Sequence, residues 1–282
     1  MPHLSDDEKN QILDYYAQGL EIDRLKKGIG HLEGARTREI ISRYLDDSVQ
    51  VIMDIGGGTG IYAAWLAEKG YDVRLYDLSP ENIEIATQSN SAISQCKVAD
   101  ARKIPAEDNS ADLVLLLGPL YHLIEQKDRV QALSEARRVL KPGGACIAAV
   151  INRFANLMWG VTTFGRDNRY LEDKVFFDMM LVEANTGQHI RPPEYPWFLA
   201  RAYLHHPEEL QDEMLAAGFD SPDIMAVEGP GWMMPDFEEA WQDKNTQEFL
   251  MKLLRNIEKD PSLMGAGPHI IGVGRKAKEV KI

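Results

Sequence analysis

The spacing of hydrophobic and polar positions changes twice along this chain of 282 residues. Between residues 5 and 45 the apolar side chains recur at helical spacing, which predicts two helices joined near Gly28 and Gly30. From residue 46 to residue 151, short apolar runs alternate with segments of helical periodicity. This alternation is typical of βαβ units, so we predict an α/β core with a parallel sheet and helices on both faces.

Within this core the apolar runs that we expect as strands are 49–55, 71–78, 96–100, 111–118 and 145–151, and the expected helices are 60–69, 80–90 and 126–140. The alternation stops after residue 151, and segment 153–204 is rich in aromatic and methionine side chains. A helix at 206–219, a strand near 223–228 and a final strand at 268–276 follow. We therefore expect N-terminal helices in 1–45, a core of 46–152 and 205–282, and insertions at 153–204 and 231–267.

Composition narrows the function classes. The formal charge of −13 argues against a protein that tracks a nucleic-acid backbone, since such binding needs a basic face. Two cysteines, Cys96 and Cys146, are too few for a disulfide framework or a cysteine-based zinc site. No apolar run is long enough to cross a membrane and the first residues are acidic, so we expect a soluble, cytoplasmic protein with no membrane partner. The oligomeric state is not predicted.

The segment VIMDIGGGTG (51–60) carries the most chemistry, because an apolar strand runs into glycines that open a helix. Glycines let the backbone approach a ligand closely, and the helix start offers free N–H groups. The spacing G-x-G-x-G of Gly56, Gly58 and Gly60 differs from the dinucleotide pattern G-x-G-x-x-G, and no P-loop lysine follows. Asp54 at the strand end would repel a diphosphate but attract a cation, which favours a nucleoside carrying ammonium and sulfonium groups.

Five blocks in order resemble the class I S-adenosylmethionine-dependent methyltransferases. They are VIMDIGGGTG (51–60), VRLYDLSP (73–80), KVADARKIP (97–105), ADLVLLLGPLYHL (111–123) and RVLKPGGACIAAVI (138–151). The resemblance implies a Rossmann-like, doubly wound sheet of seven strands whose last strand is antiparallel, with N-terminal helices and an inserted helical cap. It implies S-adenosylmethionine as cofactor and S-adenosylhomocysteine as product.

The resemblance also assigns roles to individual residues. It places Asp77 on the ribose hydroxyls, and Asp100 with Ala101 at the adenine. The full set of expected cofactor contacts is Tyr16, Arg24, Asp54, Gly56, Gly58, Thr59, Asp77, Leu78, Asp100, Ala101 and Leu117. Arg24 and Tyr16 enter as donors to the methionine carboxylate, although Arg24 could instead pair with a neighbouring glutamate.

The strand-four block also ends in the candidate catalytic pair, Tyr121 and His122. A histidine titrates near neutral pH and could accept a proton from the nucleophile, while a buried histidine of the core is the alternative interpretation. No metal-binding motif occurs. The aromatic segment 153–204 is interpreted as a lid that doubles as the acceptor pocket, or otherwise as the core of an inserted lobe.

These features predict methyl transfer to an oxygen, nitrogen or carbon nucleophile of a small, largely apolar molecule. The segment GPLYHL (118–123) is similar to the quinone and natural-product branch of the family. Three alternatives are weighed: a non-catalytic S-adenosylmethionine-binding regulator, a methyltransferase acting on protein or RNA, and an NAD-dependent oxidoreductase. The acidic charge and the absence of an Asn/Asp-Pro-Pro-Tyr block argue against nucleic acid, and the glycine spacing argues against NAD.

Overall fold

A computed structural model describes residues 23–166 and 168–278, so the candidate Tyr16 lies outside the described residues. Seven strands form one sheet in the order β3-β2-β1-β4-β5-β9-β8. The strands are β1 (Val51–Ile55), β2 (Asp72–Asp77), β3 (Gln95–Val98), β4 (Ala111–Leu116), β5 (Leu140–Ile151), β8 (Asp220–Ala226) and β9 (His269–Arg275). Strands β1 to β5 are parallel.

The last strand confirms the predicted topology. Strand β9 lies antiparallel between β5 and β8 over its whole length. Because β9 joins the sheet from the other direction, the N-terminal end of β9 lies at the same edge as the carboxyl ends of the parallel strands. The registers pair Ile151 with His269, at the end of β5 and the beginning of β9.

Alternating side chains give the sheet two buried faces, as the doubly wound arrangement requires. In β1, Ile52 packs with helices α2, α3 and α4, whereas its neighbour Met53 packs with α6 and α9 on the other face. The helices on the first face are α2 (Gly30–Ser42), α3 (Ile61–Ala67) and α4 (Pro80–Ser89), and those on the second are α6 (Gln126–Val139) and α9 (Pro207–Ala216).

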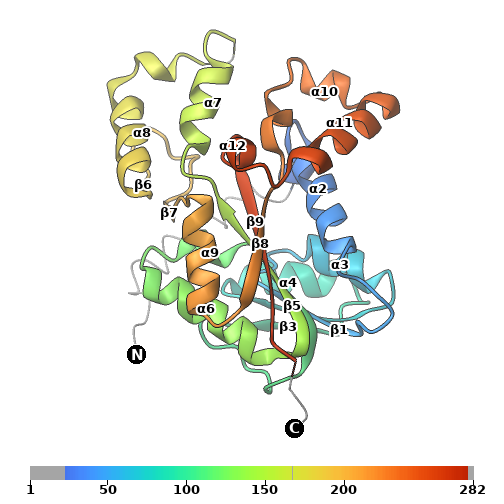
Figure 1. The fold of residues 1–282 in the computed structure, drawn as a ribbon. Helices are drawn as coiled ribbons and strands as arrows, with labels where there is room; N and C mark the ends of the chain where they lie inside the picture. The colour runs from blue at the N-terminus through green and yellow to red at the C-terminus, as the bar shows by residue number, and fades with distance from the viewer. Residues whose placement is uncertain (1–22, 167, 279–282) are drawn as a thin grey trace.

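Two segments extend beyond the edge of the sheet at which the parallel strands end (Figure 1). The first contains α7 (Ala155–Thr163), η2 (Tyr170–Glu172), α8 (Lys174–Thr186), β6 (Gln188–Ile190) and β7 (Arg201–Tyr203). The second contains η3 (Gly229–Met233), α10 (Phe237–Ala240), α11 (Lys244–Ile257) and α12 (Pro261–Met264). No helix in the described ranges has the length and apolar character needed to cross a membrane.

Each of these segments has its own small core. In the first, which we call the aromatic lobe (residues 155–203), Phe176 and Tyr195 are buried among aromatic and methionine neighbours. In the second, Leu250 and Leu254 of α11 pack against Leu32 of α2. The hairpin β6–β7 was not predicted, since strands of three residues are too short to show an alternating pattern.

Several strand boundaries differ from the prediction by a few residues, among them those of β5 and β3. Strand β5 begins at Leu140 rather than 145, after a register shift where it pairs with β4. Strand β3 ends at Val98, so Asp100 lies beyond the strand in a turn closed by an isolated bridge to Lys103. The expectation that Asp100 ends strand three was therefore wrong by two positions.

Candidate active site

Two adjoining pockets lie where the parallel strands end, and both are lined by Gly56 and Gly118. The first pocket is lined by Gly56, Asp77, Leu78, Ser79, Ala99, Asp100, Ala101, Gly118, Pro119, His122 and Leu123. The second is lined by Arg24, Leu25, Asp54, Gly56, Gly57, Gly58, Thr59, Ile61, Tyr62, Asn82, Leu117, Gly118 and Tyr121. We call the two together the crevice. It lies at the strand-end position where open α/β sheets bind ligands.

The glycine loop after β1 forms the floor shared by both pockets. Gly56 has φ of 71°, and a Cβ atom there would lie 2.4 Å from Cγ of Pro119. Gly58 has φ of 57° and no atom within 4 Å of the position a Cβ would take. The loop therefore requires glycine for its conformation and leaves backbone open towards the crevice.

Asp77, the predicted ribose acceptor, also holds the loop in place. Its carboxylate accepts hydrogen bonds from the backbone N–H groups of Gly58 and Ser79, both at 2.8 Å, and from the Asn82 amide at 3.2 Å. Burial raises the pKa of Asp77 above its ordinary value. Ribose hydroxyls would therefore have to share this carboxylate with protein donors, of which the Asn82 amide makes the longest of the three bonds.

Asp54 lies at the end of β1 and is only 1% exposed. Its Oδ2 atom makes no hydrogen bond within the described part of the chain. Burial, reinforced by the negative charge of Asp77, raises the pKa of Asp54 to about 7. A buried carboxyl oxygen without a donor, on the wall of a pocket, is suited to receive a cationic group.

Arg24 lines the same pocket as Asp54. It belongs to the short helix η1 (Arg24–Lys26), which is far from Asp54 in the sequence. Its Nη2 donates to Oε1 of Glu33 at 2.8 Å, and its Nη1 contacts the other oxygen of that carboxylate. Arg24 is thus paired with a glutamate, as one interpretation expected, and it also lines the crevice, while its role as a donor to the cofactor's carboxylate stays a prediction. Arg24 gives this pocket a cation, and Asp54 gives it a carboxyl group that ionises near pH 7.

The remaining predicted contacts divide between the two pockets. Leu78, Asp100 and Ala101 line the first, and Thr59 and Leu117 line the second. The Asp100 carboxylate is bound by its neighbour Arg102, whose Nη2 lies 2.6 Å from Oδ2. Asp100 thus contributes to the crevice through a carboxylate that is already paired.

The candidate catalytic residues come from the short helix α5 (Pro119–His122), directly after the shared Gly118. Tyr121 lines the second pocket and His122 the first, with their rings 4.7 Å apart. Burial lowers the pKa of His122 to about 4, so its imidazole is neutral at physiological pH.

Sequence reasoning missed several lining residues. Tyr62 and Asn82 belong to the first turns of α3 and α4, where helices begin beside the strand ends. The rule that ligands bind at strand ends could have pointed to them, since each lies within a few residues of a predicted contact. None of the described residues in 153–204 lines either pocket. The lid remains a prediction, since the aromatic side chains that suggested it pack largely on one another.

Residues 53–148 match the family model described as a methyltransferase domain. This range contains the glycine loop, Asp77, Asp100 and the α5 pair. Over residues 53–148 the chain therefore contains a methyltransferase domain, and this domain is similar to those of the class I S-adenosylmethionine-dependent methyltransferases.

Relatives and solved structures agree with this assignment. An uncharacterized methyltransferase of Mycobacterium tuberculosis is 32% identical over 49% of this chain and 56% of its own length, so the match spans little more than half of that relative. A ubiquinone/menaquinone biosynthesis C-methyltransferase of Neisseria meningitidis is 29% identical over 61% of this chain and 67% of its own. A methyltransferase structure from Methanosarcina mazei shares the fold, with a TM-score of 0.55 and 20% identity, covering 85% of this chain and 98% of the other.

S-adenosylmethionine is the cofactor of this methyltransferase family, and the crevice fits its chemistry. Its amino-acid end carries an ammonium, which would favour the ionised form of Asp54, and a carboxylate, which matches the cation Arg24 of the second pocket. Its adenosine end matches the first pocket, where apolar Leu78 and Ala101 accompany the acceptor Asp77. The two pockets meet at Gly56 and Gly118, as one elongated ligand requires.

Proposed function

We propose that this methyltransferase-family chain transfers the methyl group of S-adenosylmethionine to an oxygen, nitrogen or carbon nucleophile of a small, largely apolar molecule. The observation that carries the proposal is the paired crevice, which has a charge-complementary end at Arg24 and Asp54 and an apolar end with Asp77. The α5 residues Tyr121 and His122 adjoin the place where the two ends meet.

The residues of the chain bind and orient both reactants. When bound, the cofactor supplies an activated methyl group whose leaving group needs no protonation. Asp77 and the open backbone at Gly58 hold the nucleoside, while Arg24 and Asp54 hold the amino-acid end. Fixing the reactants in line, in a crevice that excludes water, is the main contribution that such an enzyme makes.

His122 acts as a hydrogen-bond acceptor and a weak base. Because burial lowers its pKa to about 4, the imidazole is neutral at pH 7 and can accept a proton only transiently. It can orient the hydroxyl, amine or acidic C–H of an acceptor towards the methyl group, and a proton that it takes up passes on to solvent. This suits an acceptor that is already acidic, such as a phenol or an enol.

Charge and relatives support a small apolar acceptor. The chain carries a net charge of −13, which disfavours RNA. The relative from Neisseria meningitidis is named as a C-methyltransferase of ubiquinone and menaquinone biosynthesis, which is compatible with a small-molecule acceptor. The aromatic lobe reaches the candidate catalytic helix, since β7 contacts α5. We propose that this lobe supplies the acceptor side of the site.

The test separates binding from turnover. Calorimetry with S-adenosylmethionine, S-adenosylhomocysteine and NAD should show binding of the first two and none of NAD. A mass-spectrometric assay with a panel of hydroquinones, phenols and amines should then detect a methylated product together with S-adenosylhomocysteine. His122→Ala should lower turnover more than it weakens cofactor binding, which calorimetry with S-adenosylhomocysteine measures separately. Tight cofactor binding with no product across the panel would contradict catalysis and favour the regulatory alternative.

A further inference from the structure

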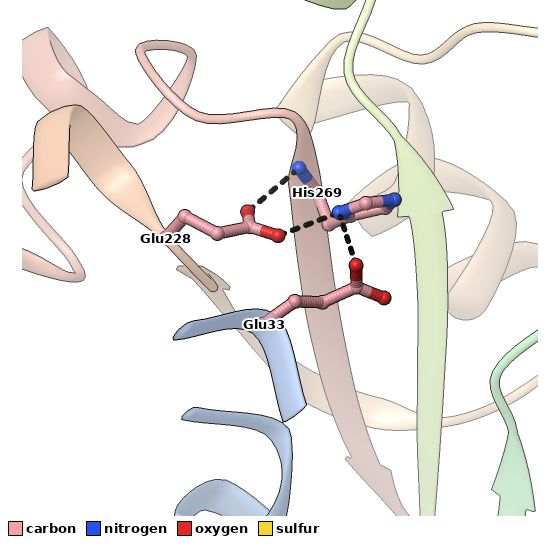
Figure 2. Close-up of side chains that lie close together, drawn as sticks. All are labelled: Glu33, Glu228 and His269. Atoms are coloured by element: carbon pink, nitrogen blue, oxygen red, sulfur yellow. Dashed lines mark hydrogen bonds and ion pairs between the residues drawn. The ribbon is translucent and has the colours of Figure 1, made fainter. Parts of the chain in front are cut away.

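Three titratable side chains from distant parts of the chain lie close together (Figure 2). Glu33 belongs to α2, Glu228 follows β8, and His269 begins β9. His269 Nδ1 lies 2.6 Å from Oε1 of Glu228 and 3.8 Å from Oε2 of Glu33. The backbone N–H of His269 also donates to Glu228 at 3.0 Å. Glu33 and Glu228 are buried.

The cluster continues through Glu33 to the crevice. Both oxygens of Glu33 contact the Arg24 guanidinium, and Arg24 lines the pocket that also contains Asp54. A bidentate contact of this kind fixes the orientation of the guanidinium as well as its position. The cluster therefore joins a residue of the crevice wall to the end of the sheet.

The charges of these side chains and of Arg24 indicate that they form an ion cluster. Burial disfavours a charged His269, but the carboxylates of Glu33 and Glu228 outweigh it and raise the pKa of His269 to about 9. Burial also opposes a charged Glu33, yet His269 and Arg24 hold its pKa below the ordinary value. Two carboxylates thus face two cations.

The same residues could in principle hold a metal ion, since their three ligand atoms lie within 4.8 Å of one another. A metal would need His269 unprotonated, and it would have to share Glu33 with a guanidinium that repels it. The balanced ion cluster is the arrangement that the contacts favour.

We propose that Glu33, His269 and Glu228 form a brace that orients Arg24 for the carboxylate of the cofactor's amino-acid end. The inference rests on the proposed cofactor site. Arg24 needs such support because it lies in a helix of three residues and its side chain is 40% exposed. Without the brace the long side chain would keep its rotamer freedom and lose it only on binding. Glu33, Glu228 and His269 are positioning residues.

Two ligands separate the brace from the rest of the site. S-adenosylhomocysteine carries the amino-acid end, whereas 5′-methylthioadenosine has the same nucleoside without it. In calorimetry, Glu33→Gln should weaken S-adenosylhomocysteine binding about tenfold, and Glu228→Gln about threefold. Both variants should leave the affinity for 5′-methylthioadenosine within about twofold.

A matched control is available in another ion cluster, one partner of which lies in the same helix as Glu33. Arg36 of α2 donates to Glu258 at 2.5 Å in another buried ion cluster that lines neither pocket. Glu258→Gln makes the same chemical change as Glu228→Gln, and it should leave both affinities unchanged. Melting temperatures of all variants, recorded without ligand, report any loss of folding.

Arg24→Met keeps the test valid if a buried substitution fails to fold, because Arg24 is partly exposed. It should reproduce the Glu33→Gln loss, and the double variant should be no weaker than either single one. Equal losses for both ligands, or additive losses in the double variant, would overturn the brace. Stoichiometric Zn²⁺ or Mn²⁺ binding that His269→Gln abolishes would replace it with a metal site. If the unaltered protein binds neither nucleoside, the proposed function fails instead.

Discussion

Of the acids in the crevice, Asp54 shows the clearest change in pKa on folding. Its pKa rises from 3.8 to about 7 because burial opposes the charge and Asp77 adds a negative neighbour. A carboxyl whose pKa is raised on folding binds more protons in the folded state, so its contribution to stability falls as the pH rises from about 4 to about 7. A bound ammonium group would reverse the preference and favour the ionised form.

Asp54→Asn should therefore stabilise the ligand-free protein while damaging the site. At pH 8 the variant should melt at a higher temperature than the unaltered protein, and this difference should shrink towards pH 4, where both side chains are neutral. S-adenosylmethionine affinity should fall about tenfold or more at pH 8, and its increase between pH 6 and pH 8 should disappear. Scanning fluorimetry and calorimetry measure these effects. If the variant melts at a lower temperature than the unaltered protein at pH 8, the ionised Asp54 carboxylate does not destabilise the folded protein.

Asp77 is the second acid whose role a single substitution tests. Its carboxylate holds the backbone of Gly58 and Ser79 and is the predicted acceptor for the ribose hydroxyls. Asp77→Ala should weaken S-adenosylmethionine binding by about 1–3 kcal/mol, the range for hydrogen bonds to a charged group. Adenine should bind both proteins equally weakly, since it lacks the ribose. Unchanged cofactor affinity in the variant would contradict the ribose assignment.

At the scale of secondary-structure elements, a buried ion pair links the helices of the second face to α5. Arg129 of α6 binds Glu213 of α9 at 2.7 Å, and both side chains are almost fully buried. Arg129 Nη1 also donates to the carbonyl oxygens of Leu123 and Ile124, at 2.8 and 2.6 Å. These carbonyls directly follow α5, so the pair fixes the end of the helix that carries His122.

Removing one partner of this pair should cost more than removing both. Arg129→Met removes the guanidinium from the buried Glu213, which keeps only the His205 ring nitrogen at 3.3 Å among the partners described here, and should lower the free energy of unfolding by about 3–5 kcal/mol. The double variant with Glu213→Leu should recover a large part of that loss. Urea unfolding at pH 7 measures both. If the double variant is as unstable as the sum of the single variants, the two residues act independently.

At the scale of the whole molecule, the aromatic lobe is the part that could close over the crevice. It has its own core around Phe176, contacts α5 through β7, and leaves apolar side chains such as Phe177 and Trp197 on its surface. A unit with its own core can shift as a body without losing its packing. The expected trigger is an apolar acceptor bound beside the cofactor.

Limited trypsin digestion tests this closure. Arg169 and Lys174 of the lobe are well exposed, as is Lys259 outside it. Cleavage after Arg169 and Lys174 should slow several-fold when S-adenosylhomocysteine and an acceptor are both present, and cleavage after Lys259 should not change. Equal rates at all sites with and without ligands would indicate that the lobe is a fixed structural addition.

The local pattern of apolar and polar residues was enough to predict the strands and helices of the core. It also predicted the part of the candidate site that lies at the strand ends. The alternation of apolar runs with helical segments predicted β1 to β5 and their helices, because strand and helix periods are set by neighbouring residues. The family resemblance supplied the antiparallel last strand, which no local period encodes. Asp54, Gly56 and Asp77 could be placed at the crevice because parallel strands bring their carboxyl ends to one edge.

Only the tertiary structure decided which charged side chains contact one another. In the sequence, Glu33, Glu228 and His269 are isolated polar residues that could each face solvent, and nothing local joins α2 to the beginning of β9. Their contact exists because α2 covers one face of the sheet while β9 enters antiparallel beside β5. The same holds for the ion pair of Arg129 and Glu213. It also holds for the aromatic side chains of 153–204, which pack on one another rather than against the crevice. Burial and long-range contact give these residues their charge states and partners, and a one-dimensional pattern carries neither.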